Sequence, residues 1–495
     1  MYTLIIVLIV LYLIYNFIHK NSKRYKNEVT GPIAFPVIGN LHLFFSKKRH
    51  PHQILTDLTK KYGLVYRFYM GHIYSLVVTD PDLIREIFVK NFDNFTDRLH
   101  LPSIKYVGGN YKGVVMADEY YWKINKAKII SSFSNSNLKK VSHILEKTAS
   151  DLLNVMNEYC SDQGGNKGNW APRLYCQKYT MNIVLRYIFN LEIPYEENVN
   201  GRVSELIDSI NSILQILKSG GAGDYISFLS PFYDFYLTHF QKDMPKINKF
   251  IEEIVMEHIQ TIDKENPRDL IDSLILQYDV TKQESINDIS CFGRELFMAG
   301  TESTANSLIW FILIMANNPN VQEKIYGELK SVSNQKSISD SEYLKLTLKD
   351  RNSTPYLNAS IKESMRYKNI GPLGIPRACK KDIVINDIFI PAGCQVFQNF
   401  HGLSHIDQFW NEPYQFLPER FLNNSHSDVF IPFSVGPRNC LGLSLAQDEM
   451  YLACANVMLN YKISPPDGVE TLDESEIFGI AIHPHHFEVK LEKRQ

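Results

Sequence analysis

Long parts of the chain place apolar residues three and four positions apart, the spacing of amphipathic helices. These parts cover 137–160, 173–190, 202–218, 242–262, 286–317, 319–331 and 441–460. Residues 64–79 instead are rich in Val, Tyr, Phe and Ile around Gly71-His72, which predicts a β-hairpin. Short strands are expected near 383–390 and 394–398, and a helix from Asp80-Pro81 to about Lys90. The pattern predicts a mainly α fold with small β-sheets.

The first eighteen residues form one continuous apolar run, broken only by Thr3 and Asn16. As a helix this run is about 27 Å long, close to the thickness of an endoplasmic reticulum bilayer. We therefore expect a membrane anchor over residues 1–19. A cleaved signal peptide and a core helix of a soluble protein are the alternatives, although no basic residue precedes the run and no small-x-small cleavage site follows it.

A basic and proline-rich segment follows the apolar run. Lys20, Lys23, Arg24 and Lys26 come before the first acidic residue, Glu28. Since basic flanks stay on the cytoplasmic side, the rest of the chain should face the cytosol. Two prolines and two glycines in Thr30–Asn40 exclude a helix there. We expect a hinge over 20–40 and one large domain over 41–495.

Composition excludes several classes of function. The chain has 495 residues with Lys+Arg 52 and Asp+Glu 54, a net charge of −2, so nothing indicates nucleic-acid binding. Its seven cysteines form no Cys-x-x-Cys pair, which disfavours a disulfide framework and a zinc ribbon. The sequence contains neither G-x-G-x-x-G after a strand nor a P-loop motif. Electrons for any redox chemistry would have to come from another protein.

One cysteine has surroundings suited to chemistry. Cys440 lies in Phe433-Ser434-Val435-Gly436-Pro437-Arg438-Asn439-Cys440-Leu441-Gly442. Gly436-Pro437 predicts a tight turn, and we expect Cys440 to begin the last long helix, whose N–H groups favour a thiolate. Arg438 adds positive charge, and Gly442 leaves room for a flat group. A thiolate beside a planar cofactor is what a haem iron requires, while a small buried apolar cysteine is the alternative.

This segment resembles the haem-binding signature of the cytochrome P450 family. Four further motifs follow the family's order, so the resemblance covers about residues 30–490. They are the proline-rich hinge, Ala299-Gly300-Thr301-Glu302-Ser303-Thr304, the E-x-x-R of Glu363–Arg366, and Pro418-Glu419-Arg420-Phe421. The resemblance implies a haem cofactor with Cys440 as the axial iron ligand. It also implies a buried structural network of Glu363, Arg366 and Arg420, although Glu363 and Arg366 alone could be a surface pair.

The resemblance implies further roles near the haem. Glu302 and Ser303 would deliver protons, but Ser303 stands where the family has threonine and lacks its stiffening β-branch. Thr304 is a possible substitute, and hydroxyls bonded to the helix backbone are the alternative. Gly300 would open a groove for O2. Residues expected at the haem itself are Trp122, Lys126, Arg377, Phe433, Arg438 and Gly442. Lys126 replaces the family's arginine, and surface charges are the alternative for Lys126 and Arg377.

Regions that line the substrate pocket in the family are apolar here. They contain Phe292, Phe297, Ile370, Leu373, Ile477, Phe478 and Ile480, for which plain core packing is the alternative. We expect a membrane-anchored, single-pass monooxygenase of the endoplasmic reticulum, facing the cytosol. It would insert one oxygen atom of O2 into an apolar small molecule with electrons from an NADPH-dependent reductase. A haem-thiolate isomerase or dehydratase and a non-enzymatic haem sensor are the other possibilities.

Overall fold

The computed structural model describes residues 2–22, 25–45, 49–160, 168–195, 202–219, 221–335, 346–423, 428–479 and 481–494. Within these ranges the chain is mainly helical with four small sheets, as the sequence predicts. The α-helices are α1 (Tyr2–Asn21), α2 (Pro51–Tyr62), α3 (Pro81–Arg85), α4 (Pro102–Val107), α5 (Glu119–Ile129), α6 (Asn135–Lys140), α7 (Ser142–Asn157), α8 (Pro172–Phe189), α9 (Arg202–Ser219), α10 (Ala222–Tyr225), α11 (Ser230–His239), α12 (Asp243–Thr261), α13 (Leu270–Ile275), α14 (Gln283–Asn317), α15 (Pro319–Asn334), α16 (Pro355–Tyr367), α17 (Phe400–His405) and α18 (Leu443–Asn460). Single turns of 3₁₀ or π-helix are η1 (Leu41–Phe45), η2 (Glu86–Lys90), η3 (Phe92–Phe95), η5 (Ser227–Leu229), η6 (Leu348–Ser353) and η7 (Pro418–Phe421).

The largest sheet has four strands in the order β1-β2-β6-β3. The predicted hairpin is confirmed as β1 (Val65–Met70) and β2 (Ile73–Val78), and β2 pairs in parallel with β6 (Gln395–Gln398), which pairs with β3 (Arg377–Ala378). The other sheets are pairs: β4 (Ile383–Ile385) with β5 (Ile388–Ile390), β7 (Tyr461–Ser464) with β10 (Lys490–Lys493), and β8 (Glu476–Ile477) with β9 (His483–Pro484). The β1–β2 turn needs Gly71, because φ is +60° and a Cβ would lie 1.8 Å from the Tyr225 carbonyl oxygen.

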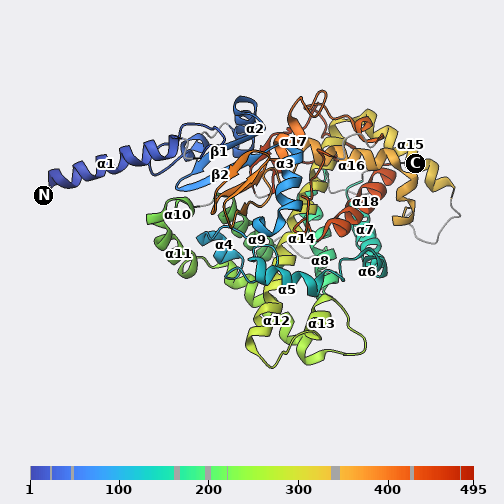
Figure 1. Ribbon diagram of the computed structural model, residues 1–495. Coiled ribbons are helices and arrows are strands. Elements are labelled where there is room, and N and C mark those ends of the chain that lie inside the picture. The colour runs from blue at the N-terminus through green and yellow to red at the C-terminus, as the bar shows by residue number, and fades with distance from the viewer. Residues whose placement is uncertain are drawn as a thin grey trace.

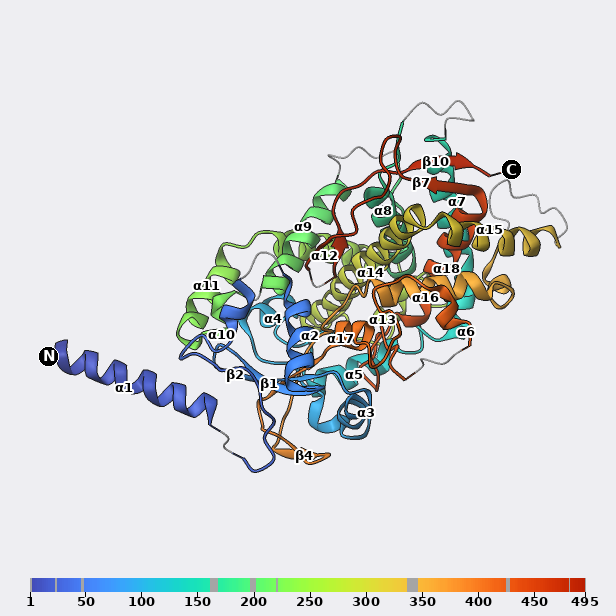
Figure 2. The same ribbon diagram turned by 90° about the horizontal axis from the view of Figure 1, so that it is seen from above.

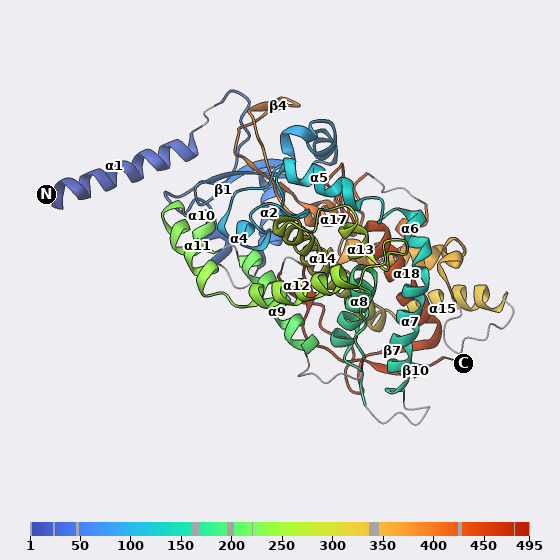
Figure 3. The ribbon, with the colours of Figure 1, turned by 90° about the horizontal axis from the view of Figure 1, so that it is seen from below.

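The long helix α14 runs through the centre of the helical part (Figures 2 and 3). It packs against α8, α12, α16 and α18. Almost every residue from Ile289 to Ala316 is buried, because apolar side chains occur on all sides of this helix. Polar residues within α14 are therefore enclosed by protein, so this helix is where buried chemistry is expected.

The N-terminal helix α1 stands apart from the rest of the molecule (Figure 1). Its length and composition would allow it to cross a membrane, and none of its 18-residue apolar window is buried. Only its C-terminal end is attached: Asn21 exchanges two hydrogen bonds of 2.8 Å with the backbone of Ala34, and Lys20 donates one of 2.8 Å to the Gly71 carbonyl. Lys20 is therefore buried in this contact, while Lys23 and Arg24 lie outside the described residues.

Candidate functional site

A cavity of about 1110 Å³ lies between α14 and the segment that precedes α18. Nine of the residues predicted at the site line it, although they come from distant parts of the chain. They are Trp122, Lys126, Ser303, Thr304, Arg377, Phe433, Arg438, Cys440 and Gly442. The tertiary structure thus brings the cysteine, the cations and the hydroxyls to one enclosure.

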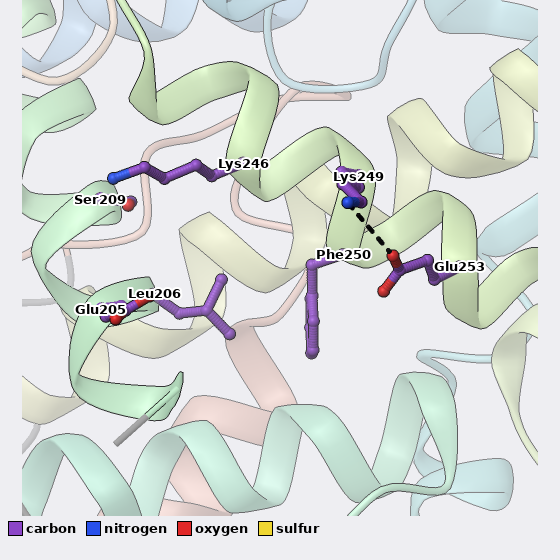
Figure 4. A pocket seen from close by; sticks show the side chains of 7 residues that line it. All are labelled: Glu205, Leu206, Ser209, Lys246, Lys249, Phe250 and Glu253. Carbon is purple, nitrogen blue, oxygen red and sulfur yellow. Dashed lines mark ion pairs between the residues drawn. The ribbon is translucent and has the colours of Figure 1, made fainter. Parts of the chain in front are cut away.

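A second hollow, of about 220 Å³, lies between α9 and α12 (Figure 4). Leu206 and Phe250 form its apolar part, and an ion pair of 4.0 Å joins Lys249 and Glu253 at its rim. None of the predicted site residues lines this hollow. It plays no part in the site around Cys440.

Cys440 lies in a tight loop before α18. Its backbone N–H donates to the Phe433 carbonyl over 2.9 Å, which closes the loop. Gly436 has φ of +79°, and a Cβ there would lie 2.0 Å from the Phe88 carbonyl oxygen, so this position needs glycine. The helix begins at Leu443, three residues later than the predicted start at Cys440. The cysteine is thus held by the loop and exposed to the cavity.

The thiol of Cys440 does not have the lowered pKa that its position before a helix predicts. Burial raises the pKa of this thiol, and a hydrogen bond from the Gly442 backbone lowers it only in part. Enclosure by apolar atoms therefore outweighs the helix N-terminus. A positive charge next to the sulfur, such as that of a bound metal ion, would favour the thiolate.

Positive charge gathers on another side of the cavity. Arg98, Lys126, Arg377 and Arg438 all line it, and none of them forms an ion pair with a carboxylate among the described residues. Burial, together with the neighbouring Arg438, lowers the pKa of Arg377 to about 9. Burial likewise lowers the pKa of Arg438 to about 10. Buried arginines without an ion-pair partner favour a bound anion, and the more distant carboxylates, Asp97 first among them, raise the pKa of Arg438 only in part.

Trp122 is the platform for two of these cations. Its ring lies 5.2 Å from the Arg438 guanidinium and 5.2 Å from the Lys126 ammonium. Arg438 also donates to the carbonyls of Thr96 and Ala117, and Lys126 donates to that of Pro437. Arg438 and Lys126 are therefore held in place by backbone oxygen atoms and by an aromatic face. Arg377 is buried, so the alternative that it is a surface charge is wrong.

Arg98 belongs to this group, but the sequence did not indicate it. It donates to the carbonyls of Val115, Ile375 and Pro376 over 2.8–3.1 Å. Burial, then Arg438 and Arg377, hold the pKa of Arg98 far below its usual range. No local motif surrounds this residue, because only the fold brings it to the other cations.

Of the three predicted proton-delivery residues, two line the cavity and one does not. Ser303 and Thr304 line the cavity, whereas Glu302 is buried against α8 and accepts a hydrogen bond of 2.7 Å from Gln177. Burial raises the pKa of Glu302. The Ser303 hydroxyl donates to the Ala299 carbonyl over 2.8 Å, which is the backbone-bonded alternative. The acid and the hydroxyl next to it in sequence are therefore not hydrogen-bonded partners here.

A buried carboxyl group that the sequence did not indicate lies beside Thr304. Glu449 of α18 lines the cavity, and a side-chain hydrogen bond joins it to Thr304. Burial raises the pKa of Glu449 far above its usual range, and its Oε2 has no partner among the described residues. Burial therefore favours the neutral acid at this part of the cavity wall.

Two glycines were expected to make room beside a flat group. A Cβ at Gly442 would meet nothing within 4 Å, so space is open there. At Gly300, in contrast, a Cβ would lie 2.7 Å from the Val184 side chain of α8. Gly300 lines the cavity, but its lack of a side chain serves the close packing of α14 on α8.

Glu363, Arg366 and Arg420 form one buried network. Arg366 holds the Glu363 carboxylate with two bonds of 2.7 and 2.8 Å, and Arg420 adds one of 3.1 Å. The Leu417 amide donates to the same carboxylate over 2.9 Å. All three side chains are buried or nearly so, and the surface-pair alternative is therefore wrong.

Most of the apolar residues expected in the substrate pocket lie elsewhere. Ile370 lines the cavity, whereas Phe292 and Phe297 pack in the main core and Leu373 packs beside the sheet. Phe478 stacks on His50 and His52 rather than on the cavity. Ile477 is absent from the lining as well, and Ile480 lies outside the described residues. Plain packing explains the described ones because a run of apolar residues does not specify which side faces a cavity.

Known proteins resemble this chain over its whole length. The family model "Cytochrome P450" matches residues 29–491. Probable cytochrome P450 508A1 of Dictyostelium discoideum is 37% identical over 496 residues, covering 100% of this chain and 99% of the relative. Probable cytochrome P450 508C1 of the same organism is 38% identical over 497 residues, with 99% of each covered. The chain therefore belongs to the cytochrome P450 family.

A solved structure shares the fold. A zebrafish cytochrome P450, whose structure was solved with abiraterone, aligns with a TM-score of 0.75 at 24% identity and covers 90% of this chain and 99% of its own. Membership makes the protein a haem-dependent monooxygenase of the oxidoreductase class. In this family a cysteine thiolate binds the haem iron.

The cavity fits such a group. Haem carries two propionates, and Arg377 Nη1 and Arg438 Nε are buried without a hydrogen-bond partner among the described residues. The open space beside Gly442 and the exposure of Cys440 to the cavity leave room for a planar ring. The unpartnered nitrogen atoms of Arg377 and Arg438 thus suit the propionates of haem, and the open space at Gly442 and Cys440 suits its planar ring.

Proposed function

We propose that this chain is a membrane-anchored monooxygenase in which Cys440 ligates the haem iron. The substrate is an apolar small molecule, and the electrons come from an NADPH-dependent reductase. One observation carries the proposal: a cysteine and four cations without carboxylate partners line the same cavity. That combination suits a metal centre with two negative side groups better than a plain lipid pocket.

Bound haem supplies the activation of O2, and the residues of this chain hold it and move protons. Arg98, Lys126, Arg377 and Arg438 would bind the propionates. Ser303 and Thr304 line the cavity, and Glu302 lies on the side of the same helix that packs on α8. To deliver a proton, the Ser303 hydroxyl must leave the Ala299 carbonyl, a rotation that serine makes more readily than threonine.

The reductase follows from what the chain lacks. Its sequence has no dinucleotide-binding fingerprint, so NADPH has to be oxidised elsewhere. An isomerase or dehydratase would need no reductase, and a haem sensor would turn over nothing. The hydroxyl-lined cavity wall favours proton delivery and thus the monooxygenase.

The experiment combines a spectrum with oxygen consumption. Cys440→Ser should abolish the red-shifted carbon monoxide absorption of the reduced protein, because serine is not a thiolate ligand. The matched control is Cys379→Ser, in a buried cysteine outside the cavity lining. Oxygen uptake with reductase, NADPH and a panel of apolar compounds is then measured. An unchanged spectrum in Cys440→Ser would refute the ligand, and no reductase-dependent uptake would favour the other two functions.

The membrane side of the proposal rests on two features that lie together. Helix α1 and the α10–α11 region are on the same side of the molecule in all three views (Figures 1–3). Five aromatic side chains of this region are 53–73% exposed: Phe228, Phe232, Phe235, Tyr236 and Phe240. An exposed apolar patch of this kind is typical of a membrane or protein contact. We infer that this side rests on the endoplasmic reticulum with the catalytic domain in the cytosol.

Truncation separates the two contacts. Removing residues 1–19 should leave part of the protein in the membrane fraction, because the aromatic patch remains. Adding Phe232→Ser and Phe235→Ser to the truncation should then release it. The measurement is flotation with endoplasmic reticulum lipids, with Phe45→Ser, an exposed aromatic outside the patch, as control. Full release by the truncation alone would remove the patch from the proposal.

A further inference from the structure

A loop between α4 and α5 forms part of the cavity wall. Val114 and Val115 of this loop line the cavity together with Leu296 and Ala299 of α14. Residues 111–118 contain no helix or strand, so neighbouring backbone does not fix their positions. Other groups must hold this part of the wall.

One carboxylate does so from the opposite helix. Glu295 Oε2 accepts hydrogen bonds from the amides of Val114 and Val115 over 2.5 and 2.8 Å. The residue is only 6% exposed, and its Oε1 has no partner among the described residues. Two amides on one carboxylate oxygen form a strong and directional contact.

The loop is shaped to let this carboxylate in. A Cβ at Gly113 would lie 2.2–2.3 Å from the carboxyl carbon and oxygens of Glu295. Since real Cβ atoms do not approach so closely, any other residue at 113 would displace the Glu295 carboxyl group from its place against the loop. Glycine at 113 and glutamate at 295 are therefore a matched pair.

Two more side chains complete the attachment. Asn125 of α5 donates to the carbonyls of Lys112 and Gly113 over 2.6 and 2.8 Å. Arg98 donates to the Val115 carbonyl over 3.1 Å. The loop thus joins α14 to one of the four cavity cations, and its position affects both the apolar wall and Arg98.

We propose that Glu295 is a positioning residue that sets the shape of the substrate cavity by holding residues 113–115. This inference rests on the proposed use of the cavity for an apolar substrate. Burial raises the pKa of the Glu295 carboxyl, and the two amides lower it in part. Burying a carboxylate at this position therefore costs free energy, and a wall that only had to be apolar would not need a carboxylate there.

The test follows loop exchange and ligand discrimination in the full-length holoprotein. Glu295→Ala should speed hydrogen exchange in a peptide covering 110–118 by about tenfold, the effect of losing one charge-assisted hydrogen bond. It should weaken binding of 4-phenylimidazole about tenfold, because the wall no longer packs on the phenyl ring, while imidazole binding stays within about twofold. Unchanged exchange, or equal effects on both probes, would overturn the proposal.

Two further variants exclude a general loss of stability. Gly113→Ala alone should reproduce the Glu295→Ala phenotype, whereas adding it to Glu295→Ala should have little further effect, because the clashing carboxyl is gone. The control is Glu328→Gln, since Glu328 also accepts from two consecutive amides, those of Tyr356 and Leu357, but outside the cavity lining. It should leave exchange at 110–118 and both probes unchanged. If the wild type bound neither probe, the proposed function would fail instead.

Discussion

Two buried groups of arginines in this protein are built alike but differ in one respect. Arg366 and Arg420 lie over the Trp410 ring and bind backbone carbonyls, as Arg438 lies over Trp122 and binds carbonyls. The first group encloses the Glu363 carboxylate, which accepts hydrogen bonds from both arginines. The second group encloses none.

The difference separates structure from binding. In the Glu363 network two arginines share one buried carboxylate, so each charged group has an opposite partner within the fold, and the network holds the segment around η7 whatever else is bound. In the group of Arg98, Arg377 and Arg438 the positive charges repel each other, no carboxylate among the described residues forms an ion pair with them, and the proposed haem would supply the negative charge. We call the Glu363 network saturated, because its arginines have a carboxylate partner, and we expect it to stabilise the fold. We call the group of Arg98, Arg377 and Arg438 unsaturated, because it has no such partner, and we expect it to bind an anion.

The largest effect is expected in the saturated cluster. Arg366→Met should lower the free energy of unfolding by about 3–5 kcal/mol, because it leaves a buried carboxylate with half of its partners. Urea denaturation of holoprotein and apoprotein measures this loss, which should be the same in both. Arg49→Met, in an exposed ion pair with Asp57, is the control and should cost less than about 1 kcal/mol. If Arg366→Met also lowered the free energy of unfolding by less than about 1 kcal/mol, the Glu363 network would not differ from the other arginine group in its structural role.

Acid should weaken the same region next. Burial, followed by Arg366, lowers the pKa of His405 to about 3, whereas the unfolded chain protonates it near 6.5. The unfolded state therefore binds more protons below pH 6.5, and stability falls as the pH drops. Between pH 6.5 and 5 this histidine accounts for about 2 kcal/mol of the fall. His405→Gln should flatten the acid limb of stability against pH, while the exposed His485→Gln should not. An unchanged limb in His405→Gln would contradict the buried neutral histidine.

The smallest effect on stability, with opposite sign, is expected in the unsaturated cluster. Arg377→Met should stabilise the apoprotein by about 1 kcal/mol, because it removes a buried cation that lacks a carboxylate partner. The holoprotein should instead lose haem about tenfold faster, since a propionate loses a partner. Thermal melting of the apoprotein and haem transfer to apomyoglobin measure the two effects. A destabilised apoprotein would mean that Arg377, like Arg366, belongs to the structural class.

Sequence pattern predicted the elements well where they were long or strongly patterned. The hairpin at 64–79 and the long helices α8, α12, α14 and α18 are confirmed. The helix expected over 80–90 is α3 followed by the π-turn η2, and the one over 137–160 is divided into α6 and α7. Local periodicity does not specify such changes, because a break in the hydrogen-bond pattern depends on packing.

The residues of the site likewise divide into those that local sequence predicts and those that only packing brings together. Cys440 and the Glu363–Arg366 pair are recognisable because each lies in one short segment. Arg98 and Glu449 are not, because their functional surroundings come from residues far away in the sequence. Glu302 shows the reverse case, since it lies in a recognisable motif but its carboxyl group is hydrogen-bonded to Gln177 of α8 and does not line the cavity.

The sequence by itself determined the family, the fold class, the cysteine and the apolar N-terminal helix, all of which depend on residues that are neighbours in the chain. Only the tertiary structure decided which charges meet and which remain unpaired. It buried the Glu363 carboxylate between Arg366 and Arg420, and it gave Arg377 a second arginine as its charged neighbour. The sequence alone does not distinguish a structural arginine such as Arg366 from one such as Arg377. The role of each is set by the charges that the fold packs around it and by the burial of these charges.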